Sequence, residues 1–203
     1  MAISDPVLED GVSLVELSVA ILIFAIFLAL LVPTYMVLTN AGQGASSMSN
    51  ADSQARLALE TLTIQVNSAE AIYATPGAVS GLTSGWIYGQ SLKMLTRAYG
   101  NLVCAEWRDD PSTSMLQERT WPPNWYQGYP TGTGWKTYAT GMENTASSPV
   151  FSIGPARGFS AGLVHADLII RAGRFGPPVE LSTTLYAQGG LNLSNDSCKH
   201  VPS

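Results

Sequence analysis

The sequence predicts an α+β fold, in which a long N-terminal helix is packed on a head of antiparallel β-strands. Three observations support this prediction. An uncharged apolar run covers residues 17–32, a following region repeats its apolar residues at helical spacing, and the later part of the chain contains β-branched and alternating segments. A chain of 203 residues is long enough for one domain with an additional segment.

The composition excludes several classes of protein. Charged residues make up 12% of the chain, against roughly 25% in soluble domains. The net charge of −5 indicates no basic patch, so no nucleic-acid binding is evident. An apolar fraction of 46% with few charges is opposite to the composition of a disordered chain. Two cysteines are too few for a disulfide-rich mini-protein or a four-cysteine zinc site, and we expect neither a metal nor a cofactor.

The apolar run, LSVAILIFAIFLALLV, has the length of a membrane span. Counted from Val12 to Val32 it holds 21 residues, which is about 31 Å of helix and close to the hydrocarbon thickness of a bilayer. No basic residue precedes it, and Pro33-Thr34-Tyr35 follows it where signal peptidase needs small residues. The sequence therefore predicts a retained membrane helix rather than a cleaved secretory signal.

Glu16 lies at the start of this run, where a carboxylate costs several kcal/mol unless it is paired or near the membrane surface. Two interpretations are open. The carboxylate lies in the headgroup layer, or it meets a positive partner inside the membrane.

The heptapeptide GVSLVEL at residues 11–17, followed at once by the apolar helix, resembles the class III signal of type IV pilins and type II secretion pseudopilins. This resemblance implies that a prepilin peptidase cleaves between Gly11 and Val12 and that the new N-terminus is methylated. It implies that Glu16, the fifth mature residue, pairs with the amine of a neighbouring subunit during assembly. Pro33 lies where pilins carry a helix-breaking proline, which loosens the helix by removing a backbone donor.

Beyond Pro33, the small polar residues 39–47 include Gly42 and Gly44, which predict a helix break or hinge. A second helix is then predicted, because apolar residues recur at steps of three and four until Thr75-Pro76-Gly77 ends it. We interpret this apolar face as core packing against a sheet. Its residues are Ala55, Ala58, Leu59, Leu62, Val66, Ala69 and Tyr73.

The rest of the chain predicts strands. Residues 102–108 and 115–121 flank an Asp109-Asp110-Pro111-Ser112 turn, which is typical of a hairpin. Residues 163–171 are rich in β-branched side chains, and residues 179–188 alternate between apolar and polar, as in a half-buried strand.

A looser resemblance extends into this part. Four later segments are similar to segments of PilW-like minor pilins and J-type minor pseudopilins. They are the helix at residues 54–62, the strand pair around residues 104–116, the segment 141–151 and the late strand VELSTT. The resemblance implies a minor subunit with a leader at 1–11, a transmembrane and filament-core helix at 12–38, and an amphipathic helix with a β-rich extracytoplasmic head at 39–203.

The implied location is the cytoplasmic membrane, crossed once with the N-terminus inside, and afterwards a cell-surface pilus or pseudopilus. The implied partners are other pilins or pseudopilins, the prepilin peptidase, the inner-membrane assembly platform and, before assembly, membrane lipid.

An alternative function is a membrane-anchored serine hydrolase. Residues 158–162, GFSAG, fit the G-x-S-x-G nucleophile elbow with Ser160 as nucleophile. Triad partners are available on paper: His165, His200, Asp167 and Asp196. The elbow requires a strand before the serine and a helix after it, whereas Gly154–Gly158 precedes the serine and a strand-like run follows. We therefore expect a subunit that assembles rather than an enzyme.

The glycine-rich segment 128–137, GYPTGTGWKT, lacks the Gly-Lys-Ser/Thr step of a phosphate loop and is predicted to be a turn-rich loop. The aromatic residues in and around it could form an exposed recognition platform. The favoured interpretation is that they fold back over the sheet, because large aromatic side chains contribute most when buried. These residues are Trp121, Trp125, Tyr126, Tyr129, Trp135 and Tyr138.

Cys104 and Cys198 are the two thiols of the chain. A head outside the membrane is compatible with a disulfide between them, which would tie the C-terminal tail to the sheet. Buried free thiols are the alternative. A metal site with His200 has no supporting spacing.

Overall fold

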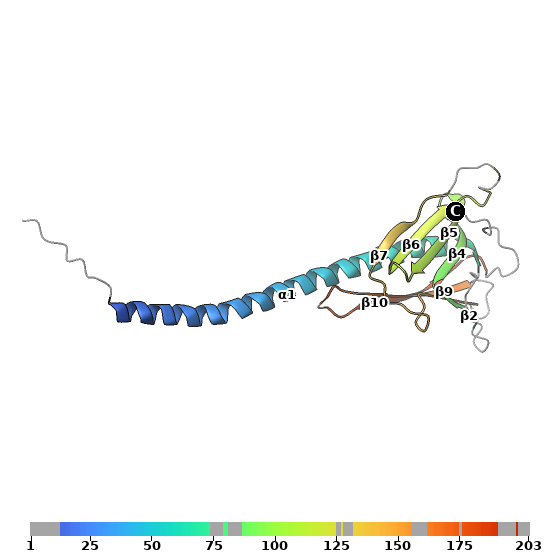
Figure 1. The fold of residues 1–203 in the computed structure, drawn as a ribbon. Coiled ribbons are helices and arrows are strands. Elements are labelled where there is room, and N and C mark those ends of the chain that lie inside the picture. Colours follow the sequence, from blue (N-terminus) through green and yellow to red (C-terminus); the bar gives the residue numbers. More distant parts are fainter. Residues whose placement is uncertain are drawn as a thin grey trace, which may run out of the picture. The chain divides into compact units, whose positions relative to one another are not determined.

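The computed structural model describes residues 13–73, 79–80, 87–124, 127, 132–155, 162–174, 176–190 and 198. The chain divides into two units, Met1–Gln43 and Gly44–Ser203. Both units contribute to one helix, α1, which covers Leu14–Asn67 (Figure 1). The predicted α+β class with a long N-terminal helix is confirmed.

The helix break predicted at residues 39–47 is wrong, because α1 continues through Gly42 and Gly44. A Cβ atom built on either glycine would meet nothing within 4 Å, so both lie on an open helix surface. There, each glycine costs only about 1 kcal/mol relative to alanine. This cost is too small to interrupt a helix that is already nucleated on both sides.

The end of α1 also differs from the prediction. The helix ends at Asn67 rather than near Thr75, and strand β1, Ala69–Tyr73, follows almost directly. The Ser68 carbonyl accepts a hydrogen bond at 3.2 Å from the Arg97 amide of strand β4, Ser91–Tyr99. Pairing with β4 therefore takes the next residues out of the helix, although their apolar spacing continues the helical pattern.

The first sheet has the order β1-β4-β5-β6-β7 with antiparallel neighbours. Its other strands are β4 (Ser91–Tyr99), β5 (Asn101–Asp110), β6 (Met115–Trp121) and β7 (Lys136–Thr140). The predicted hairpin at residues 102–121 is confirmed as β5 and β6. In its turn, the Ser112 amide donates to the Asp110 carboxylate at 3.0 Å, which is the local bond that favours aspartate in turns.

The second sheet has the order β10-β9-β8-β3-β2 and is also antiparallel. Its strands are β2 (Val79–Ser80), β3 (Ile87–Gly89), β8 (Phe151–Pro155), β9 (Gly162–Ile170) and β10 (Val179–Tyr186). The strands predicted at residues 163–171 and 179–188 are confirmed as β9 and β10. Burial alternates along both strands, as the period of two predicts.

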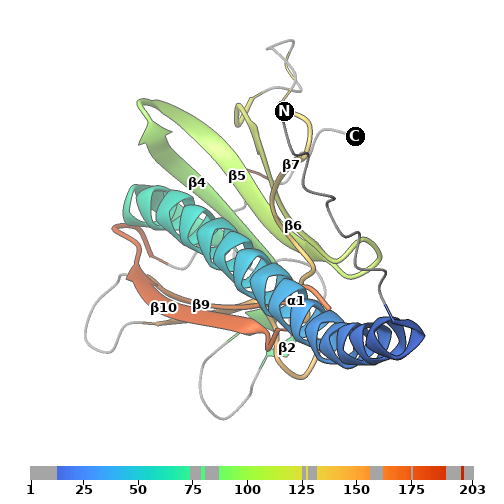
Figure 2. The ribbon, with the colours of Figure 1, turned by 90° about the vertical axis from the view of Figure 1, so that its left-hand side faces the viewer.

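The later part of α1 lies between the two sheets (Figure 2). One hydrophobic core joins this part of the helix to Leu92 and Trp107 of the first sheet and to Phe151 and Leu168 of the second. The helix contributes mostly small side chains to this core, which lets its backbone approach both sheets. They are Ala51, Ala55, Ala58, Leu62 and Val66, so the predicted core face is confirmed up to Val66.

Candidate functional site: an apolar helix with a capped carboxylate

The first part of α1 exposes an unusual amount of apolar surface. Among the described residues, 23 large hydrophobic side chains are exposed, and 18 of them lie between Leu14 and Leu38. By length and composition, α1 is long and apolar enough to cross a membrane. Monomeric soluble proteins rarely expose apolar patches of this extent, so this surface requires lipid or other protein to cover it.

Three serine and threonine hydroxyl groups in and directly after this exposed part are satisfied by the helix itself. The side chains of Ser18, Thr34 and Thr39 donate to backbone carbonyls of the preceding turn at 2.8, 2.8 and 3.0 Å. An unsatisfied polar group in hydrocarbon costs several kcal/mol. Because these hydroxyls need no water, they do not oppose burial of the helix in an apolar environment.

Glu16 has a local bond that its position in the apolar run did not suggest. Its Oε2 accepts a hydrogen bond from the Ser13 amide at 3.1 Å, and the Ser13 Oγ accepts one from the Val15 amide at 3.4 Å. The bond from Glu16 is the reciprocal bond of a capping box in an S-x-x-E sequence. The serine oxygen caps the Val15 amide, two residues on, which is the other common acceptor position of an N-cap side chain. The carboxylate also lies at the positive end of the helix dipole. The sequence S-x-x-E at residues 13–16 was the signal for this cap.

Pro33 lies inside α1 and does not end it. Its ring nitrogen has no hydrogen to donate to the carbonyl of Ala29, four residues earlier. The helix nevertheless continues on both sides of Pro33. The resemblance implies a loosened helix at this position, and the helix is not broken there.

Trp121, one of the residues that could form a recognition platform, is buried at 1% exposure. It lies in a second cluster on the opposite face of the first sheet from α1, together with Tyr73 and Leu95. The recognition role is therefore wrong for Trp121, and its burial agrees with the favoured interpretation that the aromatic residues cover the sheet.

Trp135 is half-buried and lies against two guanidinium groups. The Arg108 Cζ is 3.8 Å from its ring centroid, and the Arg119 Cζ is 4.3 Å away. Arg119 also pairs with Glu106 at 2.8 Å. Cation–π contact and ion pairing thus hold Trp135 over the sheet. Trp125, Tyr126 and Tyr129 lie outside the described residues.

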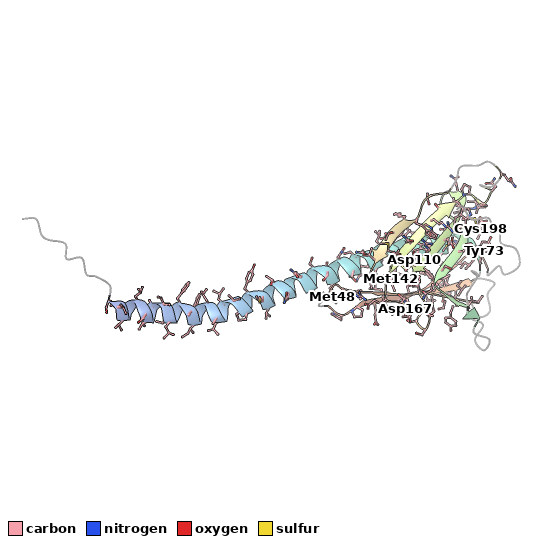
Figure 3. The ribbon with its side chains drawn as sticks, viewed as in Figure 1. Met48, Tyr73, Asp110, Met142, Asp167 and Cys198 are labelled. Atoms are coloured by element: carbon pink, nitrogen blue, oxygen red, sulfur yellow. A yellow bond between two sulfur atoms is a disulfide. The ribbon has the colours of Figure 1, made fainter. Side chains whose placement is uncertain are left out.

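The two cysteines form a disulfide, with a Cα–Cα distance of 5.7 Å across a sequence separation of 94. Both residues are fully buried in the cluster that contains Trp121. Figure 3 shows Cys198 and Tyr73 at the same end of the head. The bond attaches position 198 to β5, the middle strand of the first sheet.

A buried polar network between α1 and the first sheet was missed in the sequence. Gln65 is fully buried, donates to the Glu118 Oε1 at 2.6 Å, and accepts from the Trp107 Nε1 at 2.7 Å. The Tyr138 hydroxyl donates to the other oxygen of Glu118 at 2.9 Å. Burial raises the pKa of Tyr138, so its hydroxyl keeps the proton that it donates. The burial of Gln65 could have been predicted from its position, because it follows Leu62 by three residues and so lies on the apolar face of the helix.

Asp109 is a second buried polar group, although the sequence predicts it only as part of a turn. It is 4% exposed, and its Oδ1 has no hydrogen-bond partner among the described residues. Burial, and secondarily the charge of Asp110, raises the pKa of Asp109 to about 6. This carboxyl group is a source of pH-dependent stability.

The hydrolase alternative lacks its required local fold. Gly162, the last residue of the GFSAG motif, begins strand β9, where a nucleophile elbow requires a helix. The His165 Nδ1 lies 3.0 Å from the Thr184 Oγ1, and Asp167 follows two residues later on the same strand. Ser160, Asp196 and His200 lie outside the described residues, as do the processing residues Gly11 and Val12.

Comparison of the chain with known protein families, curated proteins and solved structures finds no match. Three features of the chain itself therefore indicate its function. They are the exposed apolar part of α1, its capped carboxylate, and a disulfide-bonded head around the later part of the same helix.

Proposed function

We propose that the chain is a minor pilin-like subunit, assembled through its N-terminal helix into a type IV pilus or a type II secretion pseudopilus. One observation carries the proposal. A single uninterrupted helix changes from a part whose apolar side chains are all exposed to a part whose small side chains are buried in the head. Such a helix can serve as an anchor and as an assembly element without any change in the head.

The exposed apolar part provides the contact surface for the proposed assembly step. Before assembly, residues 14–38 lie in membrane lipid, which also matches their satisfied hydroxyl groups. During assembly, the same surface packs against the corresponding helices of other subunits. Lipid and protein are similarly apolar, so polar contacts must set the register between helices.

Glu16 is the proposed register contact. Cleavage after Gly11 would place a positive amine on Val12, close to the positive end of the helix dipole. A carboxylate from a neighbouring subunit would compensate this charge, and the pairing would offset the cost of burying both groups. The cap on Ser13 keeps Glu16 satisfied until that partner arrives.

The proposal includes a location and a set of partners. The precursor crosses the cytoplasmic membrane once, with its N-terminus inside, and the head lies on the other side. The prepilin peptidase, the inner-membrane assembly platform and other pilins or pseudopilins act on it in turn.

Mass spectrometry of the protein from its native membrane tests the proposal. We expect an N-terminus at Val12 carrying a methylated amine. Gly11→Val should block the cleavage because it introduces a branched side chain at the cut, whereas Ser13→Ala should leave the cleavage unchanged. An N-terminus at Met1, or one beyond Pro33, would contradict the proposal.

A further inference from the structure

Four side chains with polar groups form a row across the second sheet. In the strand pairing, Ser152 of β8 lies between Tyr88 of β3 and His165 of β9. His165 is paired on its other side with Thr184 of β10. Paired residues of neighbouring antiparallel strands project from the same face of a sheet. With about 4.8 Å between strands, the row is about 14 Å long.

The row lies on the outer face of the second sheet, because the later part of α1 packs on the other face (Figure 2). The residues that alternate with His165 along β9, Val164 and Ala166, are buried in the core. His165 itself is half-buried, whereas Tyr88 and Thr184 are exposed. A ligand can therefore reach the row without any change in the core.

An open hollow of about 400 Å³ lies over this row. Its volume is in the range of small-molecule sites, about 300–1,000 Å³. Leu163, in the next row of β9, adds an apolar side chain to the lining. Its partner on β8 is Gly154, which contributes no side chain to this face. The small residues of β8 therefore leave the face low between β3 and β9.

The lining offers hydroxyl and imidazole groups for hydrogen bonding. The His165 Nδ1 lies 3.0 Å from the Thr184 Oγ1, which leaves the Nε2 of the ring for a ligand. Within the described part of the chain, the hydroxyl groups of Tyr88 and Ser152 have no hydrogen-bond partner. A hydroxyl group both donates and accepts hydrogen bonds. A ligand with several hydroxyl groups of its own can therefore satisfy the whole row.

The charges around the hollow do not favour an ionic ligand. Strands β3, β8, β9 and β10 contain no Lys or Arg. Asp167 and Glu180 project from the same face as the row, because each is an even number of positions from one of its members. A phosphate, sulfate or carboxylate group would therefore meet repulsion rather than an ion pair. Both acidic residues lie outside the lining, so they do not draw a cation into the hollow either.

The same face carries exposed aromatic side chains. In the described part of the head, the exposed large hydrophobic residues include two aromatic ones, Tyr88 and Tyr186. Tyr186 is paired with Leu163 and follows Thr184 by two positions, so it projects beside the hollow. The negative face of an aromatic ring attracts C–H groups. The hollow thus combines hydrogen-bonding groups with aromatic surface.

We propose that this hollow binds a neutral saccharide. The hydroxyl groups of a sugar donate and accept hydrogen bonds, as the row requires, and the C–H face of its ring packs against an aromatic side chain. The row is long enough for more than one sugar ring. The inference goes beyond the proposed function and concerns the head alone, so failure of either proposal leaves the other intact.

A glycan array tests the proposal. The full chain is kept in a zwitterionic detergent, because a detergent with a sugar headgroup would compete for the hollow. The array carries neutral oligosaccharides of glucose, galactose, mannose and N-acetylglucosamine, together with sialylated and sulfated ones. Saturation-transfer NMR then measures the affinity for each oligosaccharide that binds. We expect selective binding of neutral oligosaccharides with a dissociation constant of about 1 mM, because an open hollow contacts only one side of its ligand.

Substitutions in the hollow should weaken this binding. Tyr88→Ala removes the aromatic ring, and we expect about tenfold weaker binding. Ser152→Leu fills the low part of the hollow and should abolish binding. Ser182→Leu introduces the same side chain on the same face but outside the lining, and it should bind as the wild type does. Tyr35→Ala removes an exposed tyrosine of α1 and should also have no effect. Either hollow variant decides alone, provided that its thermal unfolding matches that of the wild type.

Several outcomes would overturn the inference. They are the absence of binding to every neutral oligosaccharide, a preference for the sialylated or sulfated ones, and binding that neither Tyr88→Ala nor Ser152→Leu weakens. Binding to members of a peptide library, without binding to the array, would identify a protein partner for this face and would overturn the saccharide assignment as well.

Discussion

Gln65 on α1 and Glu118 on β6 share a 2.6 Å hydrogen bond at the interface between the helix and the first sheet. Neither residue is more than 5% exposed. Apolar contacts between a small-residue helix face and a sheet tolerate rotation or sliding of the helix. A directional bond between two buried groups does not, so this pair fixes the rotation and register of the later part of α1.

Replacement of Gln65 tests this role. Gln65→Leu keeps most of the side-chain volume but removes the donor to the Glu118 Oε1 and the acceptor of the Trp107 indole, while Tyr138 still donates to the Glu118 Oε2. We expect a loss of about 2–4 kcal/mol in the free energy of unfolding, measured by urea denaturation of the full chain in detergent. Leu57→Ala, at an exposed position of the same helix, should change stability by less than about 0.5 kcal/mol. Similar effects of the two substitutions would contradict the role of Gln65.

The buried Asp109 should make stability fall as pH rises. Its pKa is raised to about 6 from an ordinary value of 3.8, so between these values the folded state binds more protons than the unfolded state. The penalty is absent below pH 3.8 and complete above about pH 6, where it amounts to at most about 3 kcal/mol. Asp109→Asn should therefore stabilise the chain at pH 7.5 and have little effect at pH 3.5.

Denaturation of both proteins across this pH range measures the difference. Asp110→Asn is the matched control with the opposite sign. Hydrogen bonds from Ser112 lower the pKa of Asp110, so loss of this carboxylate should reduce stability at neutral pH and have no effect in acid. The same change removes the smaller contribution of Asp110 to the raised pKa of Asp109, which offsets part of the loss. A benefit of Asp109→Asn that does not depend on pH would exclude titration of this group as its cause.

Glu16 has two roles that substitution can separate. Glu16→Gln keeps an oxygen for the Ser13 amide, because glutamine also forms capping boxes, but it removes the negative charge. We expect incorporation into sheared filaments to fall several-fold. Ser13→Ala weakens the cap by about 1 kcal/mol but keeps the charge, and it should assemble normally. Equal amounts of Glu16→Gln and wild type in the filaments would rule out pairing with an amine.

The disulfide closes a long loop and should contribute much of the stability of the head. Conversion of both cysteines to alanine should lower the free energy of unfolding by about 2–5 kcal/mol. Thiol labelling of the denatured, unreduced chain provides an independent check. We expect no reactive thiol without reductant and two with it, and two thiols without reductant would mean that the bond does not form.

Substitution by alanine should have opposite effects on stability at glycines of α1 and at Gly173 in the β9–β10 turn. Gly42→Ala and Gly44→Ala meet open space, and each should raise helix stability by about 1 kcal/mol. Gly173→Ala combines a positive φ with a clash against Ser47, and it should cost about 1–3 kcal/mol. Ser47→Gly should recover part of that loss if the contact is its cause. Thermal unfolding of the four variants measures all of these differences.

Local pattern was sufficient for part of this fold. The spacing of Ala55, Ala58, Leu62 and Val66 reflects a helix with one buried face, and this face is the one in the core. The hairpin of β5 and β6 was predictable because the Asp110–Ser112 bond is formed within the turn itself. The exposed apolar part of α1 was equally clear, since it depends on composition alone.

Other features depend on contacts that are distant in sequence. Ala69 and Tyr73 continue the helical spacing, but pairing with β4 about 25 residues later places them in a strand. Strand β8 is short and contains Gly154 and Pro155, so its place in the second sheet comes from its neighbours β3 and β9. Gln65 was overlooked because its partner Glu118 is 53 residues away.

The Cys104–Cys198 bond also determines which part of the head can carry a mechanical load. If the chain is pulled between its N-terminal helix and its C-terminal tail, the covalent path leaves β5 at Cys104 and enters the tail at Cys198. Strands β6 to β10 lie in the closed loop between these residues and cannot be drawn out while the bond is intact. Tension is borne by α1, by the strands β1 to β4 and by the start of β5. The second sheet keeps β8, β9 and β10 inside the loop, whereas β2 and β3 lie on the loaded path, so its edge at β2 and β3 is the part that force would detach.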